Sequence, residues 1–220
     1  GDLDRDGDVD LLTGGGYDDF VSPPNRLWLN DGAGVFTESA SFPDGEGMST
    51  QFELADVDLD GDVDVLTTNG VENHLAAPGG TSALLLNAGN GQFLENLAFK
   101  AATWNDPAFN MTAIRAGDVD GDGDLDLHVG RSDPTATDGT PGQPNLLLLN
   151  DGTGHFVDES ATHLLPGLSE NTQDARFADL DGDLDLDLVV ANSVYSMLPA
   201  ASGQLAGRPA GPGAALWFPG

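Results

Sequence analysis

Short apolar stretches alternate with polar and glycine-rich turns along most of the chain, in a pattern typical of antiparallel strands. Residues 52–55, 113–116 and 175–178 alternate apolar and polar side chains, and so do residues 63–66 and 125–129. Alternation with a period of two places every second side chain on one face of a strand. No apolar stripe with a 3.6-residue period is long enough to predict a helix, so we expect an all-β fold.

A second apolar stretch leads each time into a tight glycine turn and then a phenylalanine. It reads LWLNDGAGVF at 27–36, LLLNAGNGQF at 84–93 and LLLNDGTGHF at 147–156. The Asn-x-Gly-x-Gly turn is typical of a hairpin, because glycine readily adopts the positive φ that such turns require. We expect the phenylalanine that ends each copy to pack in the core.

A nine-residue stretch with aspartate at every other position lies between the alternating strands. Its four copies begin at Asp2, Asp56, Asp118 and Asp179, at spacings of 54, 62 and 61 residues. Each repeat then contains four strands in the order strand, acidic loop, strand, variable loop, strand, glycine turn, strand. Such a unit cannot close its own edges or bury both faces, but repeated radially it forms the blades of a β-propeller.

We therefore predict an all-β β-propeller of four-stranded antiparallel blades, with residues 1–220 forming a single propeller region. Its repeats span approximately 1–40, 41–100, 101–160 and 161–220. The first and last repeats are incomplete, so we expect an arc of a larger propeller of about seven blades in a longer chain. The third strand of the last repeat is either residues 216–219, or residues 194–198 with a fourth strand at 215–218.

The composition excludes several classes of partner. The formal net charge is −30, and 20 of the 37 acidic residues lie in the four acidic loops. Four divalent cations would add eight positive charges and still leave −22. Only seven Lys and Arg residues are present, so we expect neither nucleic acid nor an anionic membrane as a partner. No apolar run approaches the ~20 residues that span a bilayer, which argues against direct membrane insertion.

The five carboxylates of each loop repel one another unless a cation lies among them. Calcium takes six to eight oxygen ligands. Aspartates at loop positions 1, 3 and 5 can converge on one centre, because glycine at position 6 permits a sharp turn. The main-chain carbonyl of position 7 then points inward, and the aspartate at position 9 closes the site. The aspartate side chain at position 7 faces either solvent or the surroundings of the site. The candidate ligands are Asp2, Asp4, Asp6, Asp8 and Asp10, Asp56, Asp58, Asp60, Asp62 and Asp64, Asp118, Asp120, Asp122, Asp124 and Asp126, and Asp179, Asp181, Asp183, Asp185 and Asp187.

Other interpretations of the acidic loops fit less well. An EF-hand needs a glutamate at position 12 and flanking helices, whereas position 12 here is Thr13, Thr67, Val129 and Val190. A merely solvated acidic loop does not explain four copies with identical aspartate spacing. The ligand type also allows Mg²⁺ or Mn²⁺, although many oxygen donors favour calcium. We expect up to four Ca²⁺ ions, bound more weakly in the fourth loop, where Leu184 replaces the glycine.

The acidic loop together with Leu-x-Leu-Asn-Asp-Gly-x-Gly-x-Phe, at a spacing of roughly 60 residues, resembles the FG-GAP/VCBS repeat family. The resemblance covers nearly the whole chain. It implies a β-propeller related to the headpiece of integrin α subunits, with one Ca²⁺ per loop bound by side chains 1, 3, 5 and 9 and by carbonyl 7. It also implies a secreted or cell-surface protein that acts in adhesion or ligand binding. Leu184 and the incomplete ends depart from the family pattern.

In an up-and-down blade, the acidic loops and glycine turns share one face, and the variable connections share the other. These variable segments are 14–24, 70–81, 131–144 and 192–214, and 40–51, 97–112 and 161–173. Recognition usually lies in variable loops on a rigid scaffold. We therefore expect a calcium-stabilised extracellular binding or adhesion module for a protein or carbohydrate ligand. The alternative is a non-catalytic or scaffold propeller of a secreted polysaccharide-degrading enzyme.

The variable segments hold three candidate recognition residues, Trp104, Tyr17 and His163. Trp104 could stack on a sugar, or it could cap the core beside Phe109. The four histidines form no recognisable catalytic pattern, and neither a cysteine nor a Gly-x-Ser-x-Gly motif is present. Aspartates committed to calcium would not serve as paired catalytic carboxylates, so we expect no enzymatic activity.

Overall fold

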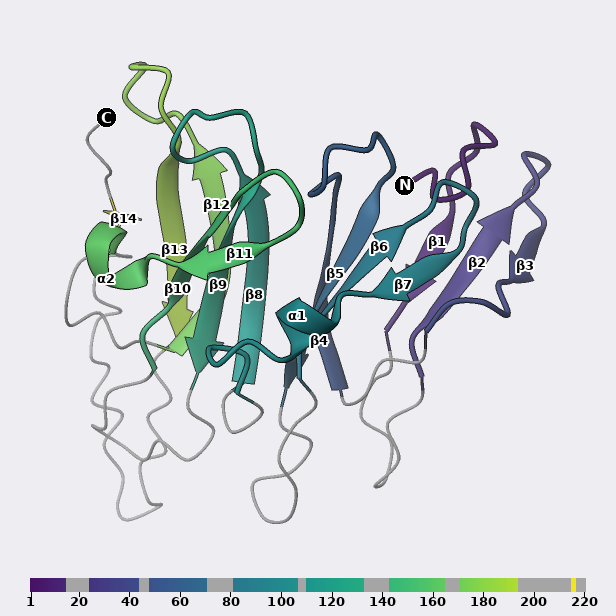
Figure 1. Cartoon of the computed structure of the whole chain (residues 1–220), viewed down its shortest axis with the longest axis horizontal. Coiled ribbons are helices and arrows are strands. Elements are labelled where there is room, and N and C mark those ends of the chain that lie inside the picture. Colours follow the sequence, from purple (N-terminus) through teal and green to yellow (C-terminus); the bar gives the residue numbers. More distant parts are fainter. Residues whose placement is uncertain are drawn as a thin grey trace, which may run out of the picture.

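The computed structural model describes most of the chain, namely residues 1–14, 24–43, 48–70, 81–106, 110–132, 143–164, 171–193 and 215–216. These residues form antiparallel sheets and two single-turn helices (Figure 1). The sheets stand side by side in an open arc, each with its strands running roughly between the same two edges of the molecule (Figure 1). The described chain is thus an all-β arc of propeller blades, which confirms the predicted fold class.

The strands follow one another in space as they do in sequence. They are β1 (Leu11–Thr13), β2 (Arg26–Asn30), β3 (Phe36–Glu38), β4 (Met48–Ala55), β5 (Asp64–Gly70), β6 (Ala83–Asn87), β7 (Phe93–Glu95), β8 (Asn110–Gly117), β9 (Asp126–Ser132), β10 (Leu146–Asn150), β11 (Phe156–Asp158), β12 (Asn171–Ala178), β13 (Asp187–Ser193) and β14 (Ala215–Leu216). The sheets are β1–β3, β4–β7, β8–β11 and β12–β14, and they are called the first to fourth blades below. The second and third blades have the four strands that the sequence predicts.

The fourth blade supports one of the two predicted alignments of the last repeat. β14 pairs directly with β13, with Leu188 opposite Leu216 and Val189 opposite Ala215. It therefore takes the place of the third strand, as the alignment at residues 216–219 predicts, although residues 217–219 lie outside the described residues. The other alignment needs residues 194–198, which lie outside the described residues.

The first strands of the second, third and fourth blades are longer than predicted and carry an irregularity. β4, β8 and β12 each span eight residues. Each pairs with the next strand through a register shift at the equivalent position, between Ser49 and Gln51 in β4 and between Met111 and Ala113 in β8. A register shift of this kind bends a strand and increases its local twist. The pattern of apolar and polar residues in the sequence does not reveal this register shift.

Side chains on these first strands connect neighbouring blades. The hydroxyl of Thr50 donates to the carbonyl of Met111 at 2.7 Å, and Thr112 donates to the carbonyl of Thr172 at 2.6 Å. The buried side chain of Arg115 donates from Nε to the carbonyl of Ala175 at 2.9 Å, and its guanidinium also pairs with carboxylates of the second and fourth blades. Polar contacts thus cross both interfaces of the third blade.

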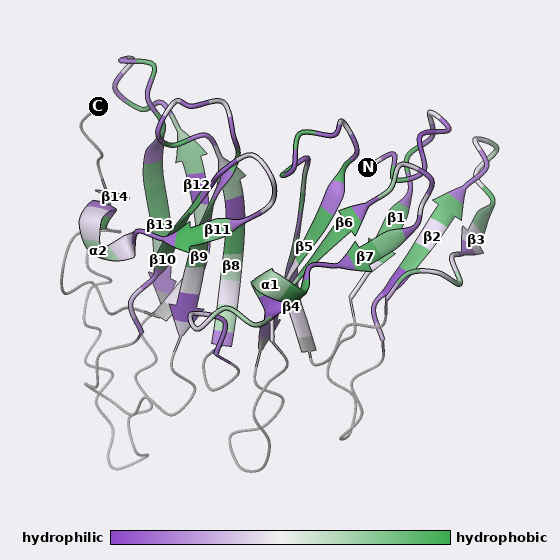
Figure 2. Ribbon diagram, viewed as in Figure 1, coloured by the Kyte–Doolittle hydropathy of each residue, from purple (hydrophilic) through white to green (hydrophobic). Residues whose placement is uncertain are grey.

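The apolar core lies between the blades. Alternate residues of β5 and β6 face opposite neighbours, as a period of two requires. Leu66 and Leu84 pack in a cluster with residues of the third blade, whereas Val65 and Leu85 pack in a cluster with residues of the first blade. The central strands are accordingly apolar along much of their length (Figure 2).

The three phenylalanines that follow the glycine turns do not share one environment. Phe93 is 5% exposed and Phe156 is 9% exposed, so the core prediction is confirmed for both. Phe36 is 44% exposed, and the prediction is wrong there. All three residues open the outer strand of their blade, but Phe93 packs edge-on against Phe42 and Phe156 against Phe99, which follow the preceding blades, whereas no described blade precedes the first.

Two single-turn helices, α1 (Leu97–Lys100) and α2 (Ser160–His163), follow the last strands of the second and third blades. The sequence analysis missed them because four residues cannot show a helical period. The signal for α1 is local: the Asn96 side chain caps the helix by accepting from the backbone N–H groups of Ala98 and Phe99. Neither of these described helices is long and apolar enough to cross a membrane.

Candidate metal centres

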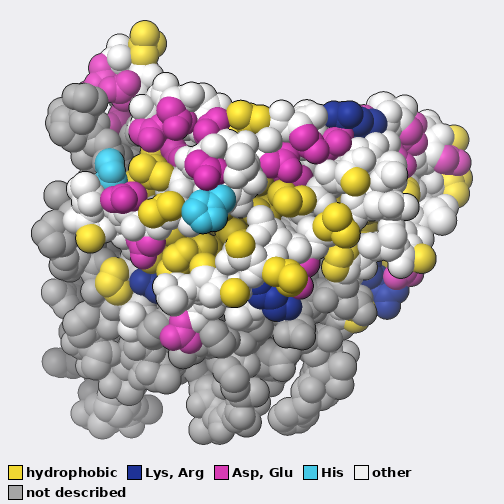
Figure 3. All heavy atoms as spheres, in the orientation of Figure 1, with side chains coloured by type: hydrophobic (Ala, Val, Ile, Leu, Met, Phe, Trp, Pro, Cys, Tyr) yellow, Lys and Arg dark blue, Asp and Glu magenta, His cyan; other side chains and the backbone are white. Residues whose placement is uncertain are grey.

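The four acidic loops occupy one edge of the arc. In the second, third and fourth blades each loop connects the first strand to the second, as the loop from Ala55 at the end of β4 to Asp64 at the start of β5 does. In the first blade the loop precedes β1, which corresponds to the second strand of the other blades. The glycine turns between the third and fourth strands lie along the same edge (Figure 1). Acidic side chains gather along that edge on the visible surface (Figure 3). The arrangement of loops and turns on one face is the one expected for up-and-down blades.

Two positions in every loop have left-handed backbone conformation. Position 6 has φ between 81° and 98° in the four loops, including 81° at Leu184. Position 4 is also left-handed, with φ of 63° at Arg5, 59° at Leu59, 78° at Gly121 and 85° at Gly182. The sequence predicted the turn at position 6 but not the one at position 4. The reason is that two of the four loops carry a bulky residue at position 4, where the left-handed conformation is costly.

The same hydrogen bonds curl all four loops. The carboxylate at position 1 accepts from the N–H of position 6, position 3 accepts from position 5, and position 5 accepts from position 7. In the second loop these bonds run from Gly61 to Asp56 at 3.0 Å, from Asp60 to Asp58 at 3.3 Å, and from Asp62 to Asp60 at 2.8 Å. The loop with Leu184 keeps this pattern, because the N–H of Leu184 still donates to Asp179 at 3.1 Å.

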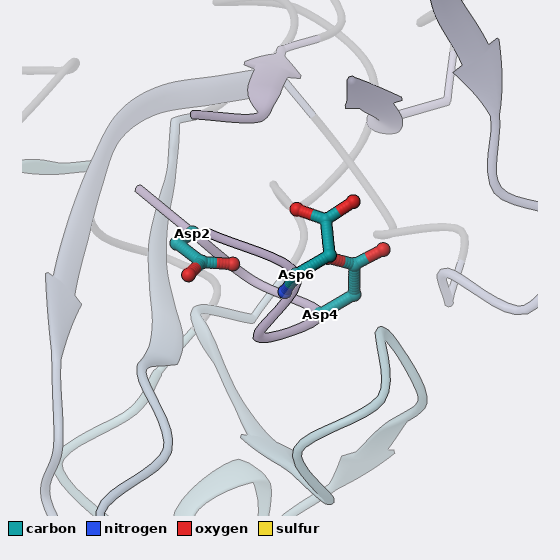
Figure 4. Close-up of side chains that lie close together, drawn as sticks. All are labelled: Asp2, Asp4 and Asp6. Carbon is teal, nitrogen blue, oxygen red and sulfur yellow. Dashed lines mark hydrogen bonds between the residues drawn. The ribbon is translucent and has the colours of Figure 1, made fainter. Parts of the chain in front are cut away.

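Carboxylate oxygens converge in each of the four loops. Positions 1, 3 and 5 each offer an oxygen within 4.8 Å of the others in the first and third loops, and positions 1, 3 and 9 do so in the second and fourth. The groups are Asp2, Asp4 and Asp6, then Asp56, Asp58 and Asp64, then Asp118, Asp120 and Asp122, and finally Asp179, Asp181 and Asp187. Figure 4 shows the first group, in which three side chains extend from one short curled segment. Convergence of this kind is what a hard cation with oxygen ligands requires.

The aspartate at position 9 is buried and holds two parts of the blade together. In the second blade, Asp64 is fully buried and accepts from the N–H groups of Val57 at 3.0 Å and Asn87 at 2.8 Å. Burial raises the pKa of Asp64 to about 6, despite these two donors. Burial, followed by the charge of Asp60, also raises the pKa of Asp58. A cation among these carboxylates would offset both causes.

The aspartate at position 7 belongs to none of these groups, and in the first three loops it contacts the glycine turn instead. A Cβ added to Gly89 would lie 2.6 Å from an Asp62 oxygen, and one added to Gly152 would lie 2.7 Å from an Asp124 oxygen. Asp8 lies against Gly32 in the same way. The converging groups leave out the four position-7 candidates, Asp8, Asp62, Asp124 and Asp185, and also the predicted ligands Asp10, Asp60, Asp126 and Asp183.

These contacts explain why the acidic loop and the glycine turn occur together in the sequence. The asparagine that begins the turn donates its N–H to the position-9 carboxylate and its side-chain amide to the carbonyl of position 8. Asn150 does so with Asp126 at 2.9 Å and with Leu125 at 3.1 Å. Asn30 and Asn87 make the same two bonds. The sequence pattern marks this asparagine only as a turn residue, because its contacts with the acidic loop form only in the folded chain.

The loops offer oxygen atoms that suit a cation. Oδ1 of Asp2 and Oδ1 of Asp56 are buried and have no hydrogen-bond donor among the described residues. Burying a carboxylate oxygen without a partner is costly, and a divalent cation would satisfy it. In the other two loops, the equivalent oxygens of Asp118 and Asp179 accept from the glycine at position 4, at 2.8 and 2.7 Å. The donor set and the unpartnered oxygens therefore fit a hard cation such as calcium.

One of the three candidate recognition residues, Trp104, has a structural place. Trp104 is 9% exposed, and its ring packs edge-on against Phe99 at 4.9 Å between centroids. It caps the core, which is the second of the two interpretations given above. His163 is exposed in α2. Tyr17 lies outside the described residues.

An arc of propeller blades with a convergent acidic loop in each blade defines a class of repeat protein with candidate cation sites. The model of the family described as FG-GAP-like repeat matches residues 2–67, 72–129 and 135–190. These matches cover most of the chain and include all four acidic loops, so the chain belongs to the FG-GAP-like repeat family. The resemblance inferred from the two coupled motifs is confirmed. A search of curated proteins gave no match.

Proposed function

We propose that the chain is a calcium-stabilised binding module of an extracellular or cell-surface protein, without enzymatic activity of its own. The observation that carries the calcium proposal is the unpartnered Oδ1 of Asp2 and of Asp56, each within a group of converging carboxylates. The side chains at positions 1, 3, 5 and 9 hold the ion in each loop. When bound, calcium supplies positive charge that relieves carboxylate repulsion and fixes the loop between the first two strands.

The third loop offers a matched pair of substitutions to test this proposal. Asp120 belongs to a converging group, whereas Asp124, in the same loop, faces Gly152. Asp120→Asn and Asp124→Asn remove the same charge, but only Asp120→Asn removes a ligand. Calcium titration by calorimetry is expected to show one ion fewer for Asp120→Asn and an unchanged number for Asp124→Asn. Equal stoichiometry in both variants would contradict the assigned ligand set.

We further propose that the module recognises a protein or carbohydrate ligand through the variable connections opposite the acidic loops. Support comes from the arrangement of the blades, since the acidic loops and glycine turns occupy one edge and leave the other connections free to vary. FG-GAP-like repeats are typically extracellular binding domains, which supports the proposal of an extracellular binding module. A glycan array probed with the calcium-loaded chain tests the carbohydrate class. Binding that persists after exchange of the segment 70–81 for a Gly-Ser linker would argue against this location.

A further inference from the structure

The side chains of Asn87 and Asn150, called the bridging asparagines here, each contact two acidic loops at once. Nδ2 of Asn87 donates to the carbonyl of Val63 in its own loop at 3.0 Å and to the carbonyl of Leu3 in the first loop at 2.9 Å. Nδ2 of Asn150 donates to Leu125 in its own loop at 3.1 Å and to Val57 in the second loop at 2.7 Å. Both asparagines are buried, so these four bonds are shielded from competing water.

The two residues whose carbonyls accept these bonds are also hydrogen-bonded to the predicted ligands. Leu3 and Val57 occupy position 2 of their loops. The N–H of Leu3 donates to Asp10 at 2.7 Å, and the N–H of Val57 donates to Asp64 at 3.0 Å. The backbone N–H of Asn87 donates to the other oxygen of Asp64 at 2.8 Å. An uninterrupted series of hydrogen bonds therefore runs from the position-9 carboxylate of the first loop to that of the second.

The same series continues into the third loop. It passes from Asp64 through Val57 to the amide of Asn150, and the N–H of Asn150 donates to Asp126 at 2.9 Å. The position-9 carboxylates of three consecutive loops are thus joined through two bridging side chains. A loop ordered by a cation holds its neighbour's bridging asparagine in place, and that asparagine in turn holds the neighbour's own loop.

Two further contacts cross the same interfaces close to the ligands. Arg5, at position 4 of the first loop, forms an ion pair with Asp62, at position 7 of the second. A Cβ added to Gly91 in the second blade would lie 3.4 Å from the Cβ of Asp4, a ligand candidate of the first loop. Positions 2, 3 and 4 of the first loop therefore all contact the second blade. A change in the conformation of this loop would alter these contacts.

The bridge is confined to part of the arc. The amide of Asn30 donates to the carbonyl of Val9 in its own loop. Among the hydrogen bonds of the described residues, it makes no bond to a second loop. No asparagine amide joins the third and fourth loops within the described part of the chain either. Within the described residues, this series of hydrogen bonds therefore joins the first three loops and does not extend to the fourth.

We propose that Asn87 and Asn150 are positioning residues that couple the first three calcium loops, so that these loops fill cooperatively while the fourth fills independently. The inference rests on the proposed function, since it presupposes that the loops bind calcium. The physical basis is shared ordering: an ion that orders one loop reduces the conformational entropy that the next ion must remove. Coupling between sites commonly changes affinity by about 5- to 150-fold, and we expect at least a fivefold effect here.

The first test removes calcium binding at one loop and leaves the bridging asparagines in place. Asp58→Asn disables the second loop, and Asp181→Asn disables the fourth, with the same charge change. Calcium titration of the full 220-residue chain is expected to show at least fivefold weaker binding at the remaining loops in Asp58→Asn and unchanged binding in Asp181→Asn. Equal affinities at the remaining loops of the two variants would overturn the coupling.

The second test assigns the coupling to the bridging amide. Asn87→Ala and Asn30→Ala lose the same bond to their own loop, but only Asn87→Ala loses a bond to another loop. We expect a Hill coefficient above 1 in the wild type and Asn30→Ala, and a reduced one in Asn87→Ala with the same number of ions. Cooperative binding that is equal in all three proteins would overturn the role of the amide. Non-cooperative binding in the wild type would refute the coupling alone, whereas no calcium binding at all would refute the proposed function.

Discussion

At the scale of single residues, Leu184 adopts the left-handed conformation of the glycines that it replaces, and its loop keeps the hydrogen bonds of the other loops. Its φ of 81° matches the glycines at position 6 of the other loops, and its side chain is 88% exposed. The loop therefore keeps its hydrogen bonds while a bulky residue carries the cost of a left-handed conformation. The sequence allowed this conclusion because three other copies show glycine at the same position.

Replacement of Leu184 by glycine is expected to stabilise the protein by about 1 kcal/mol. The gain arises from relief of backbone strain, and the exposed side chain sacrifices no packing. Urea unfolding in the presence of calcium measures the effect. Leu180→Gly in the same loop is the control, since Leu180 has no positive φ and glycine there is expected to destabilise. Equal effects of the two substitutions would mean that φ at position 184 is not the cause.

His128 is a buried histidine whose role is packing. It is fully buried in β9, its ring nitrogens have no hydrogen-bond partner, and its ring lies 6.5 Å from that of Phe177 between centroids. Burial, followed by the positive charge of Arg115, lowers the pKa of His128 to about 3. The unfolded chain binds this proton near pH 6.5. The neutral form therefore contributes stability above that pH, and the contribution declines as the pH falls from about 6.5 toward about 3.

His128→Leu is expected to remove this dependence on pH. Near pH 7 its free energy of unfolding should lie within about 1 kcal/mol of the wild type, because the two unpartnered nitrogens are lost together with some packing. Below pH 6.5 the wild type should lose up to about 1.4 kcal/mol per pH unit relative to the variant. Urea unfolding at pH 7 and 5 tests this, with exposed His163→Leu as the control. A constant difference between His128→Leu and wild type at both pH values would refute the prediction.

At the scale of structural elements, the sequence predicted the strands well and their irregularities poorly. Alternating side chains revealed the strands that flank each acidic loop, and the glycine turns revealed the hairpins. The bulge in β4 near Ser49 and the single turn of α1 were missed. Both depend on contacts that leave little periodic trace, such as the Asn96 cap of α1. Phe36 was placed in the core because its motif matches those of Phe93 and Phe156, although its strand lies at a different place in the arc.

The glycine turn acts as a support for the acidic loop, and this can be tested at Gly89. Its φ is 77°, and an added Cβ would lie 2.6 Å from an oxygen of Asp62, which is buried and paired with Arg5. Gly89→Ala is therefore expected to destabilise by roughly 2–4 kcal/mol, from backbone strain together with the steric contact.

Gly34, the second glycine of the turn in the first blade, provides the control. Its φ is also positive, at 84°, but no heavy atom lies within 4 Å of an added Cβ. Gly34→Ala is expected to cost only the strain, roughly 1–2 kcal/mol. Thermal or urea unfolding of both variants measures the difference. If Gly34→Ala proved as costly as Gly89→Ala, the contact between turn and loop would not contribute to stability.

At the scale of the whole molecule, the sequence predicted the propeller but not how its blades are joined. The repeat spacing and the coupled motifs were sufficient for the fold class and for the family. The contacts between blades join residues far apart in the chain, such as Asn87 with Leu3 and Arg115 with Ala175. No local pattern reports such pairs. The convergence of three carboxylates in each loop followed from spacing, whereas the contact of position 7 with the glycine turn required the folded arrangement.

Calcium is the proposed stabilising ligand of the acidic loops, and thermal unfolding with and without the ion is the sharpest test of this role. An ion present at about 100 times its Kd stabilises the folded state by about 2.7 kcal/mol per site. In a chain of this size, each kcal/mol raises the Tm by roughly 2–4 °C. We therefore expect the Tm of the full chain to fall by more than about 5 °C when calcium is replaced by excess EGTA, and to recover when calcium is restored. An unfolding curve that is the same in calcium and in EGTA would contradict this role.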